Sequence, residues 1–379
     1  MRVAILNITA GGLSEGYKKY INEIVPLLVS HPKVDALLIA VPETRELYHL
    51  QTRFERVTWI NYVPSRFFKL LPNDVSTNIS SFNPDVVFIP TARTFRIDHI
   101  PTVTMVRNME TFAYKGPNPL TERMIIFLRW FAAKRAIRSA DRIIAVSDFV
   151  KRHLISRYGV PESDIGVVYH GVDKIPRSEK PHSIPPGWEH RFLFAAGSIR
   201  PYRGLEDLIR SFGRLSPECR IQYRGVVIAG ATSRIMTNYV DKLRSEAQQL
   251  GIAPNIHWVG NLNENQMSWC FSNCSAFVMT SRVEACPNVA LEAMAHGCLV
   301  ISTRNDPMPE FFLNNALYYS TGNYNELARL LEDALRLAPT EKVSMQSSLF
   351  GRAKKFSWEA TVEGTVRELN QAVENGPRT

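Results

Sequence analysis

The sequence predicts two α/β domains, each built on a parallel sheet that helices cover on both faces. Short β-branched segments recur along the chain between helical segments, and their apolar character is mostly continuous rather than alternating. Strands that are buried on both faces have this pattern. The length of 379 residues favours two domains over one, and an aperiodic, proline-rich stretch at 175–191 separates two series of such segments.

The composition excludes several other classes of protein. Hydrophobic residues make up 45% and charged residues 21% of the chain, which are ordinary values for a globular protein. No apolar run reaches the roughly 18 residues of a membrane span, and residues 1–6 predict a strand rather than a signal peptide, so we expect a cytoplasmic protein. Five cysteines without a C-x-x-C pair indicate buried thiols in a reducing compartment, and no metal site is expected.

The first predicted domain begins with a strand at 3–7, a glycine-rich turn and a helix from about residue 17 to residue 28. The turn contains Gly11 and Gly12, and a strand, turn and helix in this order let backbone N–H groups approach an anionic ligand. The spacing is G-G-x-x-x-G, so a plain tight turn explains it equally well. Further strands are expected at 36–41, 57–60, 86–90, 102–106, 142–146 and 165–169.

A basic helix with an apolar, aromatic face is predicted within residues 120–138. Seven basic and two acidic residues occur between 115 and 142, and they alternate with apolar ones: Met124, Ile125, Ile126, Phe127, Leu128, Trp130 and Phe131. With a net charge of +9, this helix is typical of docking on anionic lipid. In the alternative interpretation its apolar face is core and its arginines are a solvated rim. No nucleic-acid-binding motif accompanies the charge, so no nucleic acid partner is expected.

The second predicted domain begins with a strand at 192–197. Further strands are expected at 226–230, 256–260 and 276–279, and helices at 324–337 and 358–373 close the chain. Between them, residues 281–302 predict a polar turn, a helix and a strand.

This last unit carries two carboxylates. Glu284 and Glu292 have seven residues between them, the first in the turn and the second on a helix that begins near Pro287, where proline suits the first turn. Both acids therefore border one pocket at a positive helix end.

The same stretch resembles a known family. Residues 284–300 are similar to the E-G-x-P-x-x-x-L-E-A-M-A-x-G-x-P-V run of the retaining glycosyltransferases of family 4, also termed glycosyltransferase group 1, with Ala285 for the usual glycine and Leu299 for the usual proline. The resemblance covers nearly the whole chain. It implies the GT-B fold, in which two Rossmann-like domains face each other across a cleft.

The resemblance also implies a division of the chain. It gives an acceptor-binding domain at 1–174, a linker at 175–191, a nucleotide-sugar-binding domain at 192–355 and a C-terminal helix at 356–379 that crosses back to the first domain. The implied activity is that of a hexosyltransferase. A hexose-type sugar moves from a UDP- or GDP-linked donor to a glycan or lipid-linked acceptor, in cell-envelope polysaccharide synthesis on the inner face of the membrane.

The family's motifs imply roles for individual residues of the second domain. Glu284 would bind the donor sugar, Glu292 the ribose, and the amides near Asn288 and Val289 the leaving diphosphate. The remaining positions implied to bind the donor are Gly11, Gly12, Ser198, Arg200, Arg203, Asn261, Leu262 and Pro287.

The diphosphate motif of the family, G-R-x-x-x-x-K-G, corresponds to residues 197–204. Arg203 takes the lysine position and keeps its positive charge, whereas Ser198 takes the arginine position. We expect Arg200, two residues further on, to supply the missing charge; the alternative is a surface arginine beside a turn.

In the first domain, Arg107 and Asn108 stand where the family often has His-Asp. We expect Arg107 to contact phosphate or acceptor and Asn108 to contact the sugar. The alternative is a loop pair that caps the next helix.

The resemblance implies catalysis without a metal or another cofactor. No D-x-D metal motif occurs in a strand-end loop, so positive charge would come from Arg203, Arg200 and helix N-termini. Two other functions stay open: a catalytically weakened scaffold or binding subunit, and a nucleotide-sugar 2-epimerase of related fold. The sequence does not decide the sugar, the nucleobase, the acceptor or the oligomeric state.

Overall fold

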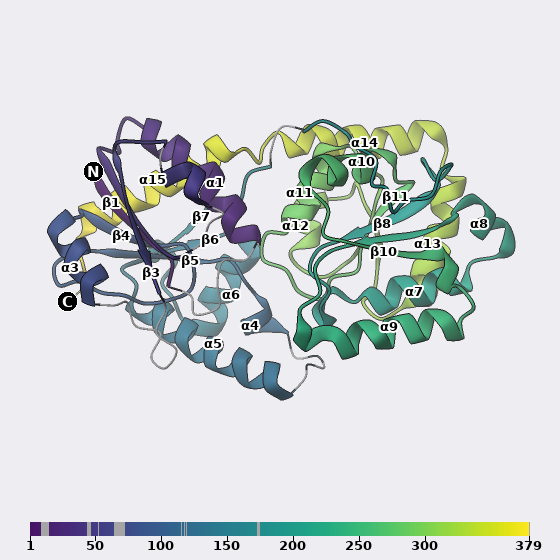
Figure 1. The fold of residues 1–379 in the computed structure, drawn as a ribbon, viewed down its shortest axis with the longest axis horizontal. Helices are drawn as coiled ribbons and strands as arrows, with labels where there is room; N and C mark the ends of the chain where they lie inside the picture. The colour runs from purple at the N-terminus through teal and green to yellow at the C-terminus, as the bar shows by residue number, and fades with distance from the viewer. Residues whose placement is uncertain are drawn as a thin grey trace. The chain divides into compact units, whose positions relative to one another are not determined.

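The computed structural model describes residues 1–8, 15–43, 47–51, 53–63, 73–114, 116, 118, 120–172 and 175–378. Their contacts divide the chain into two units. The first comprises Met1–Met109, Ile126–Gly171 and Ser357–Thr379, and the second comprises Glu110–Ile125 and Val172–Phe356. Each unit is a parallel sheet with helices (Figure 1), which confirms the predicted α/β class.

The first unit holds a seven-stranded sheet in the order β3-β2-β1-β4-β5-β6-β7. Its strands are β1 (Arg2–Leu6), β2 (Ala36–Pro42), β3 (Val57–Tyr62), β4 (Val86–Ile89), β5 (Thr102–Val106), β6 (Arg142–Ala145) and β7 (Ile165–Val167). The central strands are buried along their whole length, as their continuous apolar character predicts. The helices that follow these strands are α1 (Glu15–Ser30), α2 (Tyr48–Gln51), α3 (Asn73–Phe82), α4 (Glu110–Ala113), α5 (Leu120–Ser139) and α6 (Asp148–Tyr158).

The C-terminal helix α15 (Trp358–Asn375) packs against α1 and strands β4 to β7, so it joins the first unit as the resemblance implied. Its buried Glu368 accepts a hydrogen bond from Arg142 Nε of β6 at 2.6 Å. Gly166 of β7 makes room for this pair, because a Cβ there would lie 2.0 Å from the Glu368 carboxyl carbon. A buried ion pair therefore attaches the end of the chain to its first sheet.

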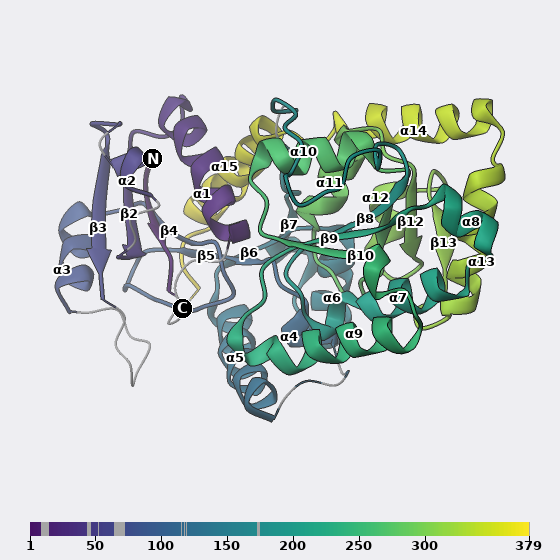
Figure 2. The same ribbon diagram turned by 45° about the vertical axis from the view of Figure 1, so that its right-hand side comes forward.

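The second unit holds a six-stranded sheet in the order β10-β9-β8-β11-β12-β13. Its strands are β8 (Phe192–Ala196), β9 (Gly225–Ala229), β10 (Ile256–Gly260), β11 (Ala276–Met279), β12 (Val300–Thr303) and β13 (Leu317–Tyr319). Two views place α7 and α9 on one side of this sheet and α10, α11 and α14 on the other (Figures 1 and 2). These helices and their neighbours are α7 (Leu205–Arg214), α8 (Pro217–Gln222), α9 (Thr237–Gln249), α10 (Glu264–Asn273), α11 (Asn288–Ala295), α12 (Met308–Phe312), α13 (Tyr324–Arg336) and α14 (Pro339–Ala353).

Two segments of the second unit, α14 and residues 175–191, differ from what the sequence predicted. The helix α14 was not predicted, because only Leu349 and Ala353 of its residues are buried and its apolar pattern is correspondingly weak. The stretch 175–191 has neither helix nor strand among its residues, yet it is packed: Ile184 and Trp188 are buried, and Trp188 meets His257 with ring centroids 4.5 Å apart.

The Arg142–Glu368 pair gives a stability prediction. Replacing Glu368→Gln leaves the buried guanidinium without its counter-charge, so we expect the first unit to lose about 3–5 kcal/mol of unfolding free energy. Urea denaturation followed by circular dichroism measures this loss. The matched control is Glu374→Gln on the exposed end of the same helix, which should change stability by less than about 0.5 kcal/mol. Equal effects of the two substitutions would contradict the anchoring role.

Candidate active site

Two loops meet at the point where the strand order of the second sheet reverses. β8 is the first strand of this unit, and it lies between β9 and β11, so the loops that follow β8 and β11 leave the sheet side by side. Ligands of open parallel sheets bind outside the carboxyl ends of the strands at such a switch point. The loop after β8 carries Arg203, and the loop after β11 carries Glu284.

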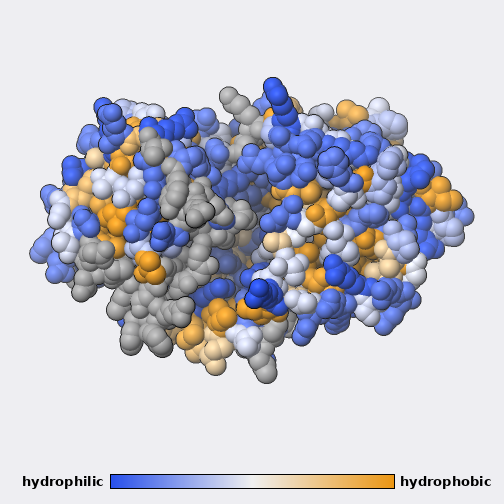
Figure 3. Space-filling model, viewed as in Figure 1, coloured by the Kyte–Doolittle hydropathy of each residue, from blue (hydrophilic) through white to orange (hydrophobic). Residues whose placement is uncertain are grey.

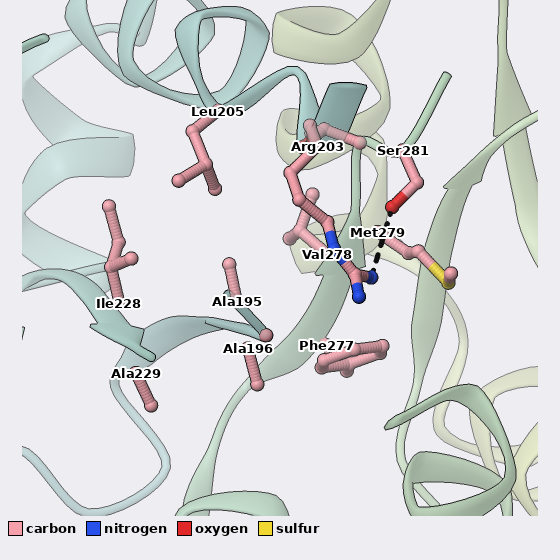
Figure 4. Close-up of a pocket in the computed structure, with 12 residues that line it drawn as sticks. Ala195, Ala196, Arg203, Leu205, Ile228, Ala229, Phe277, Val278, Met279 and Ser281 are labelled. Carbon is pink, nitrogen blue, oxygen red and sulfur yellow. Dashed lines mark hydrogen bonds between the residues drawn. The ribbon is translucent and has the colours of Figure 1, made fainter. Parts of the chain in front are cut away.

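Arg203 and Glu284 form an ion pair between these loops. Arg203 Nη1 bonds Glu284 Oε1, and it also donates to Ser281 Oγ at 3.4 Å (Figure 4). The side chains are 16% and 10% exposed, so the pair is largely shielded from water but reaches the surface. Burial is the largest influence on the pKa of Arg203 and lowers it, but Glu284, Tyr202 and Glu110 together outweigh burial and raise that pKa above its ordinary value. Arg203 is therefore a permanent cation at the switch point.

Glycine at position 197 allows Arg203 to lie there. A Cβ on Gly197 would come within 2.9 Å of the guanidinium carbon, and its φ of +123° also disfavours any side chain. Below the guanidinium, apolar side chains of β8, β9 and β11 enclose a cavity of about 10 Å³. That volume holds about one water molecule and is too small for a nucleotide. The Nε of Arg203 is buried and has no hydrogen-bond partner among the described residues.

Backbone hydrogen bonds join the two loops. Arg282 N donates to Tyr202 O at 2.8 Å, and Thr280 Oγ1 donates to Arg203 O at 2.6 Å. The side chain of Arg282 binds Glu206 on α7, with Nη2 and Oε1 2.5 Å apart. The loop of Glu284 is thus held on the loop of Arg203 and on the first turn of α7.

The helix α11 begins directly after Pro287, where the sequence predicted its start. Its first N–H groups have no partner within the helix, so they add partial positive charge beside the ion pair. Asn288, Val289 and Glu292 are half-buried, whereas the residues from Ala293 to Ala295 are fully buried. The three predicted donor-binding residues therefore share the side of α11 that reaches the surface.

The other predicted residues of the second unit lie at neighbouring strand ends. Ser198 is exposed and follows β8, while Asn261 is exposed and Leu262 half-buried after the edge strand β10. Asn261 and Leu262 directly precede the capping box of α10, in which Asn263 and Gln266 exchange hydrogen bonds.

Arg200 makes contacts that the motif comparison did not suggest. Its Nη1 donates to Glu122 Oε1 at 2.8 Å and lies 3.7 Å from Glu110 Oε1. Burial lowers the pKa of Arg200, but these two carboxylates more than compensate and raise it. Sequence reasoning missed Glu110, Glu122 and Arg282 as partners. The available signal was that the segment around 110–122 contains two acids in an otherwise basic region.

In the first unit, Arg107 and Asn108 follow β5 at the carboxyl edge of the sheet. Arg107 Nη2 donates to Gly16 O at 2.7 Å, and its guanidinium carbon lies 5.0 Å from the ring centroid of Tyr20. Asn108 is exposed. The predicted residues Gly11 and Gly12 lie outside the described residues.

Two further properties of the described residues bear on ligands and membranes. In these ranges no group of three His, Cys, Asp or Glu side chains is arranged to hold a metal ion. None of the described helices combines the length and apolar character that crossing a bilayer requires.

Comparison with known proteins covers both halves of the chain. A family model described as "Glycosyl transferases group 1" matches residues 177–347, and one described as "Glycosyltransferase Family 4" matches residues 20–174. A D-inositol 3-phosphate glycosyltransferase of Actinosynnema mirum is 24% identical over 281 residues, which are 72% of this chain and 65% of that protein. The protein of the same name from Mycobacterium tuberculosis is 24% identical over 280 residues, 72% of this chain and 56% of its own length. The chain thus spans less than two thirds of these relatives.

Solved structures resemble the chain over nearly its whole length. HepE of Anabaena, in complex with UDP, has a TM-score of 0.75 at 16% identity and covers 98% of this chain and 100% of its own. WaaG, a glycosyltransferase involved in lipopolysaccharide biosynthesis, has a TM-score of 0.68 at 12% identity. The match covers 97% of this chain and 99% of WaaG. At these identities the likeness shows the fold alone.

Proposed function

The chain belongs to the family 4 glycosyltransferases (glycosyl transferases group 1) and has their GT-B fold, and on this premise we propose that it is a retaining hexosyltransferase. It moves a hexose-type sugar from a UDP- or GDP-linked donor to a glycan or lipid-linked acceptor, in the synthesis of cell-envelope polysaccharide. The observation that carries this proposal is the Arg203–Glu284 pair at the switch point of the second sheet. The UDP bound to HepE supports a uridine nucleotide as the donor.

The proposed roles follow from the charges of the site. The Arg203 guanidinium and the N–H groups at the start of α11 receive the diphosphate, because both carry positive charge on the outer side of the sheet edge. Glu284 then accepts hydrogen bonds from the donor sugar, and Glu292 accepts them from the ribose hydroxyls. The unpartnered Nε of Arg203 provides one further donor for a phosphate oxygen.

In the proposed reaction, the acceptor hydroxyl attacks the anomeric carbon on the face from which the phosphate leaves. The new bond joins the acceptor oxygen to this carbon while the bond to the phosphate oxygen breaks. The departing phosphate takes the hydroxyl proton, so retention needs no enzyme nucleophile. Arg203 stabilises the charge that develops on the leaving group, a role that a divalent cation serves in other transferases.

The helix α5 supports peripheral binding to an anionic membrane. Its exposed side carries four large apolar residues on successive turns, and a hydrophobic area appears in the lower part of Figure 3, where Figure 1 places α5. These residues and their exposed fractions are Met124 (62%), Phe127 (58%), Leu128 (52%) and Phe131 (62%). Exposed Arg135 and Arg138 continue the same side. The interpretation of this apolar side as core is therefore not favoured, because water reaches it.

Nucleotide binding tests the site. We expect UDP or GDP, screened with ADP and dTDP, to raise the melting temperature, because a ligand at about 100 times its Kd stabilises by about 2.7 kcal/mol. Arg203→Met should abolish this shift. Glu284→Gln should keep it, because Arg203 retains its positive charge without this partner, but should lower sugar transfer about 100-fold or more, since it removes the carboxylate that accepts from the sugar. The control is Glu264→Gln at an exposed carboxylate of α10. A full thermal shift in Arg203→Met would refute the assignment.

The proposed absence of a metal requirement has its own experiment. We expect the rate of sugar transfer to stay within about twofold after dialysis against EDTA, because Arg203 and the start of α11 supply the positive charge. The assay compares the dialysed enzyme with the same enzyme in magnesium or manganese. Loss of turnover in EDTA that either ion restores would overturn this part of the proposal.

Vesicle flotation tests the α5 surface. Wild-type protein should float with vesicles that contain phosphatidylglycerol and not with pure phosphatidylcholine. The double substitution Phe127→Ser with Phe131→Ser should weaken binding about 100-fold or more, since each buried phenyl ring contributes about 1.5–3 kcal/mol. Val343→Ser, at a 60% exposed position of α14, is the control. If wild-type protein does not float with the anionic vesicles, α5 is not a membrane-docking helix.

A further inference from the structure

Residues 110–125 group with a different unit from the residues on either side of them. The chain before this segment, up to Met109, belongs to the first unit, and so does the chain from Ile126 onwards. The segment itself groups with the second unit. It contains α4, Tyr114 and the first turns of α5.

Arg200 holds this segment through two carboxylates. Glu122, on the first turn of α5, is bonded at 2.8 Å, and Glu110, at the start of α4, lies 3.7 Å away. The carboxylate side chains are only 3% and 6% exposed. A buried carboxylate is stable only when a cation or hydrogen-bond donor faces it, and Arg200 faces both.

A second contact fixes the same segment to the same loop. The rings of Tyr114 and Tyr202 meet edge to face with centroids 6.1 Å apart. Tyr202 lies between Arg200 and Arg203 in the short helical turn Pro201–Arg203, and Arg203 N donates to Arg200 O at 2.9 Å. The contacts of 110–125 thus reach the turn that carries Arg203.

We propose that residues 110–125 form a strap which Arg200 fastens to the loop of Arg203, and that Arg200 is a positioning residue for sugar transfer rather than a ligand of the diphosphate. The strap begins two residues after Asn108, and its point of attachment is three residues before Arg203. This inference rests on the proposed function.

The charges of the strap explain why Arg200 does not both hold the strap and bind the diphosphate. A guanidinium that turned toward a diphosphate would withdraw a positive charge from two buried carboxylates. Binding of the diphosphate by Arg200 would thus break the contacts that hold 110–125 on the loop of Arg203.

The two roles of Arg200 predict opposite effects of Glu122→Gln. If Arg200 holds the strap on the loop of Arg203, this substitution weakens that attachment. We then expect kcat to fall about tenfold, because Arg203 is no longer held where charge develops on the leaving phosphate, while the donor KM and the nucleotide-induced thermal shift stay unchanged, because Arg203 still binds the diphosphate. If Arg200 is a phosphate ligand that Glu122 competes for, the substitution frees it, and the donor KM falls. A lowered donor KM with unchanged kcat would overturn the proposal.

A double-mutant cycle gives a second, independent measurement. Arg200→Met should lower kcat at least as much as Glu122→Gln, because it also loses the contact with Glu110, and the double variant should be no worse than Arg200→Met, because the contact with Glu122 is already lost there. Effects that multiply, together with a raised donor KM in Arg200→Met, would refute the strap. Arg329→Met, at an exposed position of α13, is the control for loss of a positive charge.

These outcomes can be separated from a failure of the proposed function. If the wild-type protein shows neither a thermal shift with any of the four nucleoside diphosphates nor transfer from their sugars, the transferase proposal fails and the strap proposal fails with it. If wild-type protein transfers sugar, the Glu122 and Arg200 variants decide the strap alone. The nucleotide-induced thermal shift of each variant shows that its second unit is folded.

Discussion

The donor side of the site depends on one ion pair, between Arg203 and Glu284, at the switch point of the second sheet. The position of this pair and its two loops leaves no room for a side chain at two neighbouring positions. Gly197 lacks a side chain because the guanidinium occupies that space, and Gly204 lacks one because Thr280 O lies 2.5 Å from where its Cβ would be. In the absence of donor each charge neutralises the other. In the proposed function, donor binding would exchange this internal pair for two external ones, phosphate with Arg203 and sugar hydroxyls with Glu284, so neither group would be left desolvated and unpaired.

Local patterns were sufficient to predict much of this arrangement. Both sheets follow from continuous apolar strands, and the start of α11 at Pro287 follows from the helix-start preference of proline. The spacing of Glu284 and Glu292 placed both acids near one helix end because all the residues involved lie within one turn-helix unit. The attachment of α15 to the first sheet was implied by the family resemblance, since no local pattern links Glu368 to Arg142.

The features that the sequence did not reveal depend on contacts between distant residues. Arg200 was expected to supply the charge that Ser198 lacks, but its partners are Glu122 and Glu110, 78 and 90 positions earlier. No motif connects such positions. The exposure of α5 was equally undetermined, because an apolar helix side has the same sequence whether protein or water covers it. The helix α14 was missed because it buries too few residues to give a periodic pattern.

The C-terminal end of the strap and the proposed membrane surface lie on one helix, α5. Glu122 lies on the first turn of α5 and binds Arg200, while Met124, Phe127 and Phe131 are exposed on the turns that follow. An α-helix transmits displacement along its axis because each turn is hydrogen-bonded to the next. A surface that orders the exposed side of α5 therefore also orders the carboxylate that holds Arg200, and with it the turn that carries Arg203. Contact with a lipid-linked acceptor's membrane and correct placement of the donor's phosphate ligand would then stabilise each other, as linkage requires of two events that favour the same state.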